Sequence, residues 1–260
     1  MELLRSKLLA DFPHGFTTRT GGSSAAPFDT LNLGDRVEDV PEAVAENWRR
    51  LEEATGLDFA RVRQVHGARI ITGAAPTAPC EEADGVVSAS PGLAATVAVA
   101  DCVPILLARA DGEAVAAVHA GWRGTLARIA SEGVRRLAAA GAGDPPLAVI
   151  GPSIGPCCYQ VSPDLAATFA AAFGPRVIRR GPKGPHLDLW AANERALRDA
   201  GVIRVSILRR CTACEPRLFF SHRRDGGRTG RMAAFIAPPP ISGGRPSLTR
   251  AGSHLEFPRS

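Results

Sequence analysis

Short apolar runs of strand length alternate along this chain with longer segments in which apolar residues recur at helical spacing. An alternation of these two periodicities is typical of the α/β class, in which helices cover the faces of sheets. No repeat of fixed period interrupts the pattern. We therefore expect an α/β fold.

The pattern also predicts where the elements lie. Pro41 stands in the first turn of an expected helix, and Thr125 and Ser162 stand where an N-cap hydroxyl is favoured. Pro104 cannot donate to a strand ladder, so it is expected at a sheet edge or a bulge. The expected strands are residues 61–72 with a turn at 66–67, 94–108, 113–118, 147–150, 202–208 and 232–236, and the expected helices are 41–57, 126–140, 164–173 and 186–200.

Size and composition indicate a globular protein. The chain has 260 residues, of which 45% are hydrophobic, and this is enough to bury a sizeable core. It has no run of eighteen uncharged apolar residues and no signal-peptide pattern at its N-terminus, so we expect a cytoplasmic protein that does not bind membranes. One domain is expected over residues 1–237, followed by a mobile tail at 238–260 that is rich in proline, glycine, serine and charge.

Charge and cysteine content narrow the class further. The net charge of +5 comes mainly from scattered arginines and only 5% of residues are aromatic, so an anionic small substrate fits better than a nucleic acid. The six cysteines are expected to stay reduced in a chain without an export signal. Adjacent Cys157 and Cys158 do not supply the second C-x-x-C that Cys211 and Cys214 would need for a zinc motif, so packing is expected of these four.

Two histidines and one cysteine stand at the edges of apolar segments, with few polar neighbours: His66, Cys102 and His119. Two imidazoles and a thiolate suit Zn²⁺, and three protein ligands with an open fourth position are typical of catalytic zinc. Their spacing matches no short zinc-finger motif, so two alternatives stay open. In the first, each residue simply belongs to the core, and in the second, Cys102 acts as a nucleophile with His119 as its base.

Several other polar residues are candidates for binding or catalysis. The segment from Gly121 to Thr125 is an expected helix start that favours an anion. Arginines in the glycine-containing loops around Arg19 and Arg223 suit phosphate or carboxylate groups. Asp101, beside Cys102, is a candidate proton shuttle or hydrogen-bond partner for a histidine.

A set of segments in this chain resembles one known family. The ordered segments are HGFTTRTGG, LNLGD, QVHG, EADGVVS, ADCVPILL, AVHAGWRGT, IGPSIGPCCYQV, LDLWAANERAL and CTACEPRLFFSHRRDGGRTGRMAAFI. Together they are similar to the YfiH-like family, long labelled multicopper polyphenol oxidase or laccase-domain proteins. That family is now described as zinc-dependent purine nucleoside phosphorylases with adenosine deaminase and methylthioadenosine phosphorylase activity. The resemblance spans nearly the whole chain without its tail.

The resemblance implies a fold and a site. The fold would be a single α/β/β/α sandwich of mixed sheets, similar to a cysteine-hydrolase-like fold. The implied Zn²⁺ ligands are His66, Cys102 and His119, which are also catalytic candidates together with Asp101. Four arginine and glutamine residues in the segments that resemble the family are further candidates for binding substrate or phosphate: Arg19, Gln64, Arg123 and Arg223.

The implied substrates are purine nucleosides (inosine, guanosine, adenosine and methylthioadenosine) and phosphate, with deamination of adenosine by water activated at the same metal. A cysteine-dependent hydrolase built on Cys102 and His119 is the alternative. A copper oxidase ranks third, because six histidines without any H-x-H pair cannot build its copper centres. This chain has His222 where the family usually has a tyrosine, which bears on substrate preference. A monomer is the default expectation, with a homodimer as the alternative.

Overall fold

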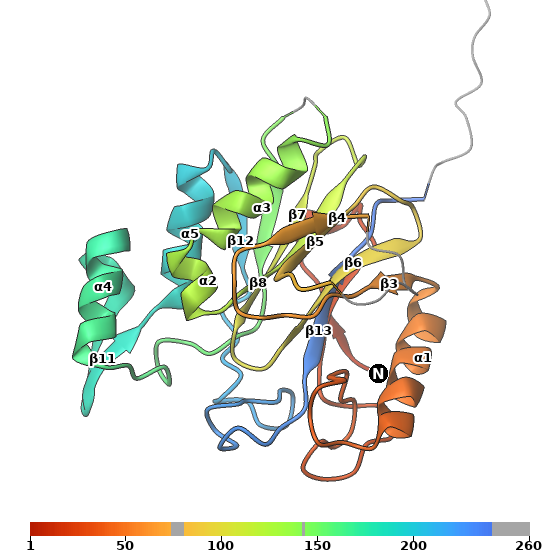
Figure 1. Ribbon diagram of the computed structural model, residues 1–260, viewed down its shortest axis with the longest axis horizontal. Helices are drawn as coiled ribbons and strands as arrows, with labels where there is room; N and C mark the ends of the chain where they lie inside the picture. Colours follow the sequence, from red (N-terminus) through yellow and green to blue (C-terminus); the bar gives the residue numbers. More distant parts are fainter. Residues whose placement is uncertain (74–80, 142–143, 241–260) are drawn as a thin grey trace, which may run out of the picture.

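The computed structural model describes residues 1–73, 81–141 and 144–240, and in it two β-sheets lie face to face between outer layers of helices (Figure 1). The six-stranded sheet has the spatial order β12 (Arg204–Ile207), β9 (Leu147–Ile150), β7 (Val103–Ala108), β8 (Val115–Ala120), β5 (Gly85–Ser88) and β4 (Ile70–Thr72). The five-stranded sheet has the order β1 (Leu3–Leu4), β2 (His14–Thr17), β13 (Met232–Ile236), β6 (Leu93–Val99) and β3 (Asp58–Ala60).

Both sheets are mixed. In the first, β12 pairs with β9 and β4 with β5 in parallel, and the central strands pair antiparallel. In the second, only β3 and β6 are parallel. The α/β/β/α sandwich of mixed sheets that the resemblance implies is therefore present.

Helices cover the outer faces of the two sheets. On the six-stranded sheet lie α2 (Trp122–Leu126), α3 (Ile129–Ala138) and α5 (Leu189–Asp199), and α4 (Pro163–Phe173) packs against α5 and the hairpin of β10 (Ile178–Gly181) and β11 (Gly184–Leu187). On the five-stranded sheet lies α1 (Pro41–Thr55). Short 3₁₀ turns at Lys7–Leu9 and Pro175–Val177 complete the described elements.

Strand β7 shows why its sequence is apolar throughout. Ile105 and Leu107 face the helix layer, whereas Leu106 faces the core between the two sheets, and all three are fully buried. A strand enclosed on both faces has no solvent side that would favour polar residues. Strand β8 is buried in the same way. This burial on both faces holds β7 and β8 in place, and the ends of these two strands reach the site described below.

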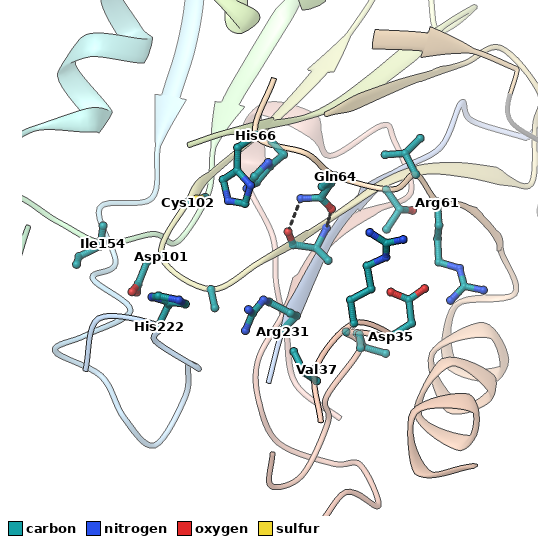
Figure 2. Close-up of a pocket in the computed structure, with 18 of the residues that line it drawn as sticks. Asp35, Val37, Arg61, Gln64, His66, Asp101, Cys102, Ile154, His222 and Arg231 are labelled. Atoms are coloured by element: carbon teal, nitrogen blue, oxygen red, sulfur yellow. Dashed lines mark hydrogen bonds between the residues drawn. The ribbon is translucent and has the colours of Figure 1, made fainter. Parts of the chain in front are cut away.

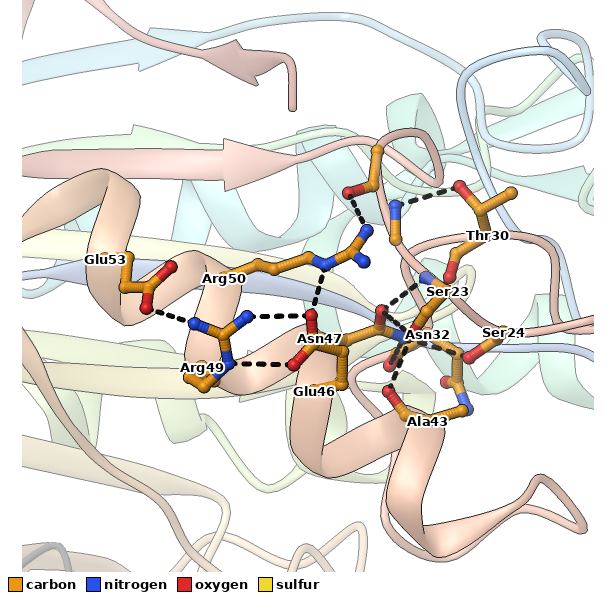
Figure 3. Close-up of polar contacts among 12 residues, drawn as sticks. Ser23, Ser24, Thr30, Asn32, Ala43, Glu46, Asn47, Arg49, Arg50 and Glu53 are labelled. Carbon is orange, nitrogen blue, oxygen red and sulfur yellow. Dashed lines mark hydrogen bonds and ion pairs between the residues drawn. The ribbon is translucent and has the colours of Figure 1, made fainter.

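Helix α1 follows its sequence signals closely. Proline stands at its N-terminus, Val44, Trp48 and Leu51 form the buried stripe, and Gly56 ends it with a left-handed φ of 67°. The buried amide of Asn47 on the same helix binds the preceding loop (Figure 3). Its oxygen accepts from the Ser23 N–H at 2.8 Å and its nitrogen donates to the Asn32 carbonyl at 2.9 Å.

Four predictions about the elements were wrong in part. Only residues 70–72 of the 61–72 segment form a strand, because hydrogen bonds to a buried carboxylate hold residues 65–67 as a loop, although His66 does lie at a bend with φ 59°. The 94–108 segment is not one strand pair, since its halves, β6 and β7, lie in opposite sheets and the break falls at residues 100–102. Thr125 lies inside α2 rather than at an N-cap, and residues 186–187 belong to β11.

Pro104 is also placed differently from the prediction. It lies inside β7, a central strand, opposite His119 of β8. Its carbonyl accepts from Gly151 N–H, just past the end of β9, so the missing donor falls at the last pair of the β7–β9 ladder and removes only one hydrogen bond. A proline is tolerated there because the neighbouring strand has already ended.

No described helix has both the length and the apolar character to cross a membrane. The expected tail begins at residue 238, and its residues 241–260 lie outside the described part of the chain.

Candidate active site

His66, Cys102 and His119 converge at one end of the six-stranded sheet, and Figure 2 labels His66 and Cys102 side by side. Their candidate donor atoms all lie within 4.8 Å of one another, and the two imidazole rings meet edge to face with centroids 4.9 Å apart. Pairing of β7 with β8 sets Val103 opposite Ala120, which brings Cys102 beside the strand that carries His119. His66 arrives on the loop between β3 and β4.

Asp84 holds two of these three groups in position. It is fully buried, just before β5, and one carboxylate oxygen accepts from His119 Nδ1 at 2.8 Å and from the His66 N–H at 2.9 Å. The other oxygen accepts from the N–H groups of Gly67 at 2.6 Å and Val65 at 3.3 Å. With Nδ1 committed to Asp84, His119 presents Nε2 as its free donor atom.

The thiol and the buried imidazole polarise each other. Burial alone would raise the pKa of Cys102, but the charge and hydrogen bonds of His119 and His66 lower it to about 6. Burial alone would lower the pKa of His119, but the Cys102 thiolate and Asp84 raise it to about 9. Near neutral pH the cysteine is therefore a thiolate, the form in which sulfur binds metals and attacks electrophiles.

Gly121 leaves the space that this convergence needs. A Cβ at this position would lie 3.1 Å from Cys102 Sγ and 3.2 Å from Cδ2 of His66. Two imidazoles and one thiolate match the ligand set of zinc, and donor atoms within 4.8 Å of one another are close enough to share an ion whose bonds are about 2.0–2.3 Å long. These residues would therefore accept Zn²⁺ with one direction left for a reactant.

A cavity of about 540 Å³ opens beside the three candidate ligands. Its apolar and aromatic wall includes Leu33, Trp48, Trp122, Ile154 and Tyr159. Its polar wall includes Asp35, Arg36, Arg61, Arg123, His222, Arg223 and Arg231 (Figure 2). An apolar wall with convergent cationic groups is suited to a flat ligand that carries or meets an anion.

The candidate binding residues differ in their relation to this cavity. Arg123 and Arg223 line it, and their guanidinium groups lie over Trp122 at 4.4 Å and Tyr159 at 5.0 Å. Arg19 does not line it. Its Nε donates to the Asp29 carbonyl at 2.8 Å, and Nη2 pairs with the Asp29 carboxylate at 3.0 Å.

Gln64 and Asp101 line the cavity but are engaged with the protein. The Gln64 amide exchanges two hydrogen bonds with the backbone of Ala98, at 2.7 and 2.8 Å, and so ties the His66 loop to β6. The Asp101 carboxylate accepts from the Thr212 hydroxyl at 2.5 Å and the Arg223 N–H at 2.6 Å. The carboxylate partner of a histidine is thus Asp84 rather than Asp101.

The expected anion site at the helix start is weaker than the sequence suggests. Helix α2 has only five residues, so the aligned peptide dipoles behind its N-terminus are few. The cations that line the cavity include Arg231, which sequence reasoning missed. The Arg231 pKa is lowered by burial, and its Nη1 donates to the carbonyls of Thr229 and Gly230 at 2.8 and 3.0 Å.

Asp84 is the other residue that sequence reasoning missed. It lies in the segment EADGVVS, where an acid stands directly before a short apolar run. That position is a usable signal, because a carboxylate at the start of a buried strand is itself buried and needs partners that donate hydrogen bonds. The structure supplies four of them, from His119, His66, Gly67 and Val65.

Comparison with known proteins gives one consistent family. A family model described as "Multi-copper polyphenol oxidoreductase laccase" matches residues 13–238. A purine nucleoside phosphorylase from Deinococcus radiodurans is 43% identical over 244 residues, which cover 92% of this chain and 94% of that protein. The purine nucleoside phosphorylase YfiH of Shigella flexneri is 38% identical over 229 residues, covering 85% and 91%.

Solved structures agree with these sequence relatives. The crystal structure of YlmD from Geobacillus stearothermophilus superposes with a TM-score of 0.85 at 35% identity, and the match covers 92% of this chain and 97% of that chain. The sequence and fold likenesses both extend over nearly the full length of the proteins compared. The chain therefore belongs to the YfiH family, whose model carries the description of a multi-copper polyphenol oxidoreductase laccase.

Proposed function

We propose that this protein is a zinc-dependent purine nucleoside phosphorylase that converts inosine, guanosine, adenosine and methylthioadenosine to the free base and the corresponding sugar 1-phosphate, and that it also deaminates adenosine. The names of its relatives support the phosphorylase activity. The observation that carries the zinc proposal is the convergence of His66, Cys102 and His119 on a point beside the cavity.

The proposed Zn²⁺ would be held by Nε2 of His119, the Cys102 thiolate and a ring nitrogen of His66. When bound, it would supply a Lewis acid for phosphorolysis and the means to deprotonate water near neutral pH for deamination. Asp84 would keep His119 in the tautomer that leaves Nε2 free and would hold the His66 loop through its backbone N–H groups.

Phosphate would be bound by guanidinium groups on the cavity wall. Arg123 and Arg223 are exposed residues that reach this wall from two different segments, α2 and the loop before β13. Planar guanidinium groups suit the oxygens of phosphate, and two of them would offset its charge as it approaches the sugar carbon. Arg223 is steadied for this role by stacking on Tyr159 and by donating to the Gln160 carbonyl at 2.9 Å.

The purine would occupy the aromatic side of the cavity. Tyr159, Trp122 and His222 all line it, and their ring faces offer stacking surface to a flat base. Burial raises the pKa of Tyr159 to about 12, so its hydroxyl stays protonated and can donate a hydrogen bond at neutral pH. His222 stands where the family usually has a tyrosine, so base preference is expected to depend on this residue.

A second candidate function rests on one specific observation. Cys102, His119 and Asp84 form a thiol–imidazole–carboxylate series, and the pKa of the thiol is lowered to about 6. A cysteine-dependent hydrolase uses the same series with the thiolate as nucleophile and needs no metal. Activity that persists after a chelator has removed all metal from the protein would favour this hydrolase function.

A copper oxidase is not proposed, despite the description of the family model. Blue-copper and multinuclear copper centres need several histidine clusters. Within residues 1–73, 81–141 and 144–240, the groups of three or more potential metal-ligating side chains are the His66 site and a cluster of four cysteines. Neither provides a multinuclear, histidine-rich set.

The test combines metal analysis with product analysis. Purified protein should contain zinc and release hypoxanthine from inosine only when phosphate is added, with sugar 1-phosphate as the second product. Adenosine should yield inosine without phosphate. Release of free ribose in the absence of phosphate would contradict phosphorolysis and indicate a hydrolase.

A variant and a matched control sharpen this test. His119→Ala should lose the zinc of the His66 site and both activities while it keeps its fold. His186→Asn removes a histidine from the β10–β11 hairpin, outside the cavity, and retains a donor for the Pro156 carbonyl that Nδ1 contacts at 2.8 Å. That control should keep both zinc and activity.

A further inference from the structure

Four cysteines from two distant segments meet at a second place in the fold. Cys157 and Cys158 lie in the turn after β9, and Cys211 and Cys214 lie in the loop after β12. The four sulfur atoms all lie within 4.8 Å of one another. Parallel pairing of β9 with β12 and a bridge between Ser153 and Cys211 bring the two loops together.

The sulfur positions match a tetrahedral cation site. Cys214 Sγ lies 3.4 Å from the sulfur of Cys158 and 3.6 Å from that of Cys157. Four thiolates that each bind zinc at about 2.3 Å in a tetrahedron stand about 3.8 Å apart. The missing C-x-x-C pair of the sequence is thus replaced in space by two adjacent cysteines.

We propose that Cys157, Cys158, Cys211 and Cys214 bind a structural Zn²⁺ ion, separate from the site of His66, Cys102 and His119. The ion would be closed to substrate, because all four positions are taken by protein sulfur. This inference does not depend on the proposed nucleoside chemistry.

The surroundings of the cluster suit a bound cation with four thiolates. The N–H of Gly155 donates to Cys211 Sγ at 3.3 Å, as backbone groups do around sulfur ligands. The Arg224 guanidinium donates to the carbonyl of Thr212, inside the C-x-x-C turn, at 2.9 Å. The same guanidinium is held by the Asp225 carboxylate at 2.7 and 2.8 Å, so it fixes the C-x-x-C turn in place.

A disulfide accounts for the cluster less completely. Two disulfides would be needed to use all four sulfur atoms, but all four cysteines are free, and Cys214 Sγ lies 3.4 and 3.6 Å from the sulfur atoms of Cys158 and Cys157, well beyond the disulfide bond length of about 2.05 Å. One divalent ion would use all four sulfur atoms at such separations. The separations therefore favour a cation over disulfides.

The ion would also steady one wall of the cavity. Cys158 precedes Tyr159, which lines the cavity, and Thr212 donates to the Asp101 carboxylate at 2.5 Å. Ile154, two residues before the turn, donates its N–H to the Asp101 carbonyl at 2.9 Å. A cation that fixes the two cysteine loops would thereby fix the segment that leads into Cys102.

The test counts metal in reduced protein that has been purified with zinc. The wild-type chain is expected to hold two equivalents of zinc. Cys158→Ser/Cys214→Ser should hold one, and Cys102→Ser should also hold one, so that each variant is the control for the other. A double variant that holds as many equivalents as the wild-type chain would overturn the proposal, whereas an unchanged zinc content in Cys102→Ser would count against the His66 site alone.

Two measurements distinguish the sites further. Cobalt substitution should give five cobalt–sulfur bonds per chain in the wild type. The thiolate-to-cobalt absorption should fall to roughly one fifth in the double variant, in which the Cys102–cobalt bond remains and the cluster no longer binds cobalt. In the wild-type chain, zinc should protect the four cysteines from alkylation and a chelator should remove that protection. Equal alkylation with and without zinc, or a disulfide among these residues in the purified protein, would refute the site without reliance on any variant.

Discussion

Replacement of Asp84 by asparagine tests how the candidate active site is held together. Each Asp84 oxygen accepts two hydrogen bonds, one oxygen from His119 Nδ1 and His66 N–H, and the other from Gly67 and Val65 N–H. Asparagine has only one oxygen, so its NH₂ group must face one of these two pairs. Asp84→Asn is therefore isosteric but mismatched in either orientation.

The size of the effect follows from the two orientations. If the NH₂ group faces His119, the ring must accept at Nδ1 and carry its proton on Nε2, which removes the donor atom for a metal. If it faces Gly67 and Val65, two half-buried N–H groups lose their acceptor at about 1 kcal/mol each. Loss of such a partner lowers metal affinity by about 10–100-fold, which corresponds to about 1.4–2.8 kcal/mol.

The assay is a competition titration of zinc against a coloured chelator, with thermal unfolding recorded in parallel. Asp84→Asn should lower the zinc affinity of the His66 site by about 10–100-fold. Asp101→Asn is the matched control, because the Asp101 carboxylate contacts Thr212 and Arg223 and no histidine. An Asp84→Asn protein with unchanged zinc affinity, or a larger loss in Asp101→Asn, would refute the reasoning.

Three further predictions concern other parts of the molecule. Gly121→Val should abolish zinc binding at the His66 site in a dialysis assay, because even a Cβ would lie 3.1 Å from Cys102 Sγ, and full zinc binding would contradict this. Asn47→Ala should reduce the free energy of unfolding in urea by about 2–3 kcal/mol, since it leaves several buried loop groups unpaired; a loss below about 0.5 kcal/mol would count against it. Burial lowers the pKa of His14 from 6.5, so the folded chain binds fewer protons than the unfolded chain, and stability should be full above that pH and fall by up to about 1.4 kcal/mol per unit below it. His14→Gln should flatten this slope in unfolding measurements from pH 8 to 5, and an unchanged slope would contradict the assignment.

The regular elements were the most predictable part of the structure. Helix α1 and strands β9 and β13 carry their own signals, in capping residues and in unbroken apolar runs, and they appear where the sequence predicts them. The order of strands in the sheets was not predictable by this route. The segments that form β6 and β7 read as one buried strand pair, yet they belong to opposite sheets. Apolar runs that reflect burial on both faces do not show which sheet a strand joins.

The candidate site shows the same division between local and long-range information. Residue chemistry marks His66, Cys102 and His119 as candidates, and the family resemblance implies that they are the ligands. The structure brings their donor atoms within 4.8 Å. The roles of their neighbours depend on contacts far apart in the chain. Asp84 reaches His119 across 35 positions, and Thr212 reaches Asp101 across 111, so no local spacing could distinguish the two acids.

The cysteine cluster could not be predicted from spacing along the chain, for a related reason. Spacing rules for zinc sites assume that ligands come in C-x-x-C pairs. Here the second pair consists of adjacent residues, and it meets the C-x-x-C turn only because β9 and β12 run side by side. Tertiary proximity, rather than spacing along the chain, defines the group.

The central claim is that His66, Cys102 and His119 share one zinc ion beside the cavity. The most direct test is anomalous diffraction, recorded above and below the zinc absorption edge, from crystals grown with zinc. We expect a peak about 2.0–2.3 Å from a nitrogen of each histidine and from the cysteine sulfur. Fully zinc-loaded crystals without a peak at that point, whether or not the four-cysteine cluster shows one, would contradict the account.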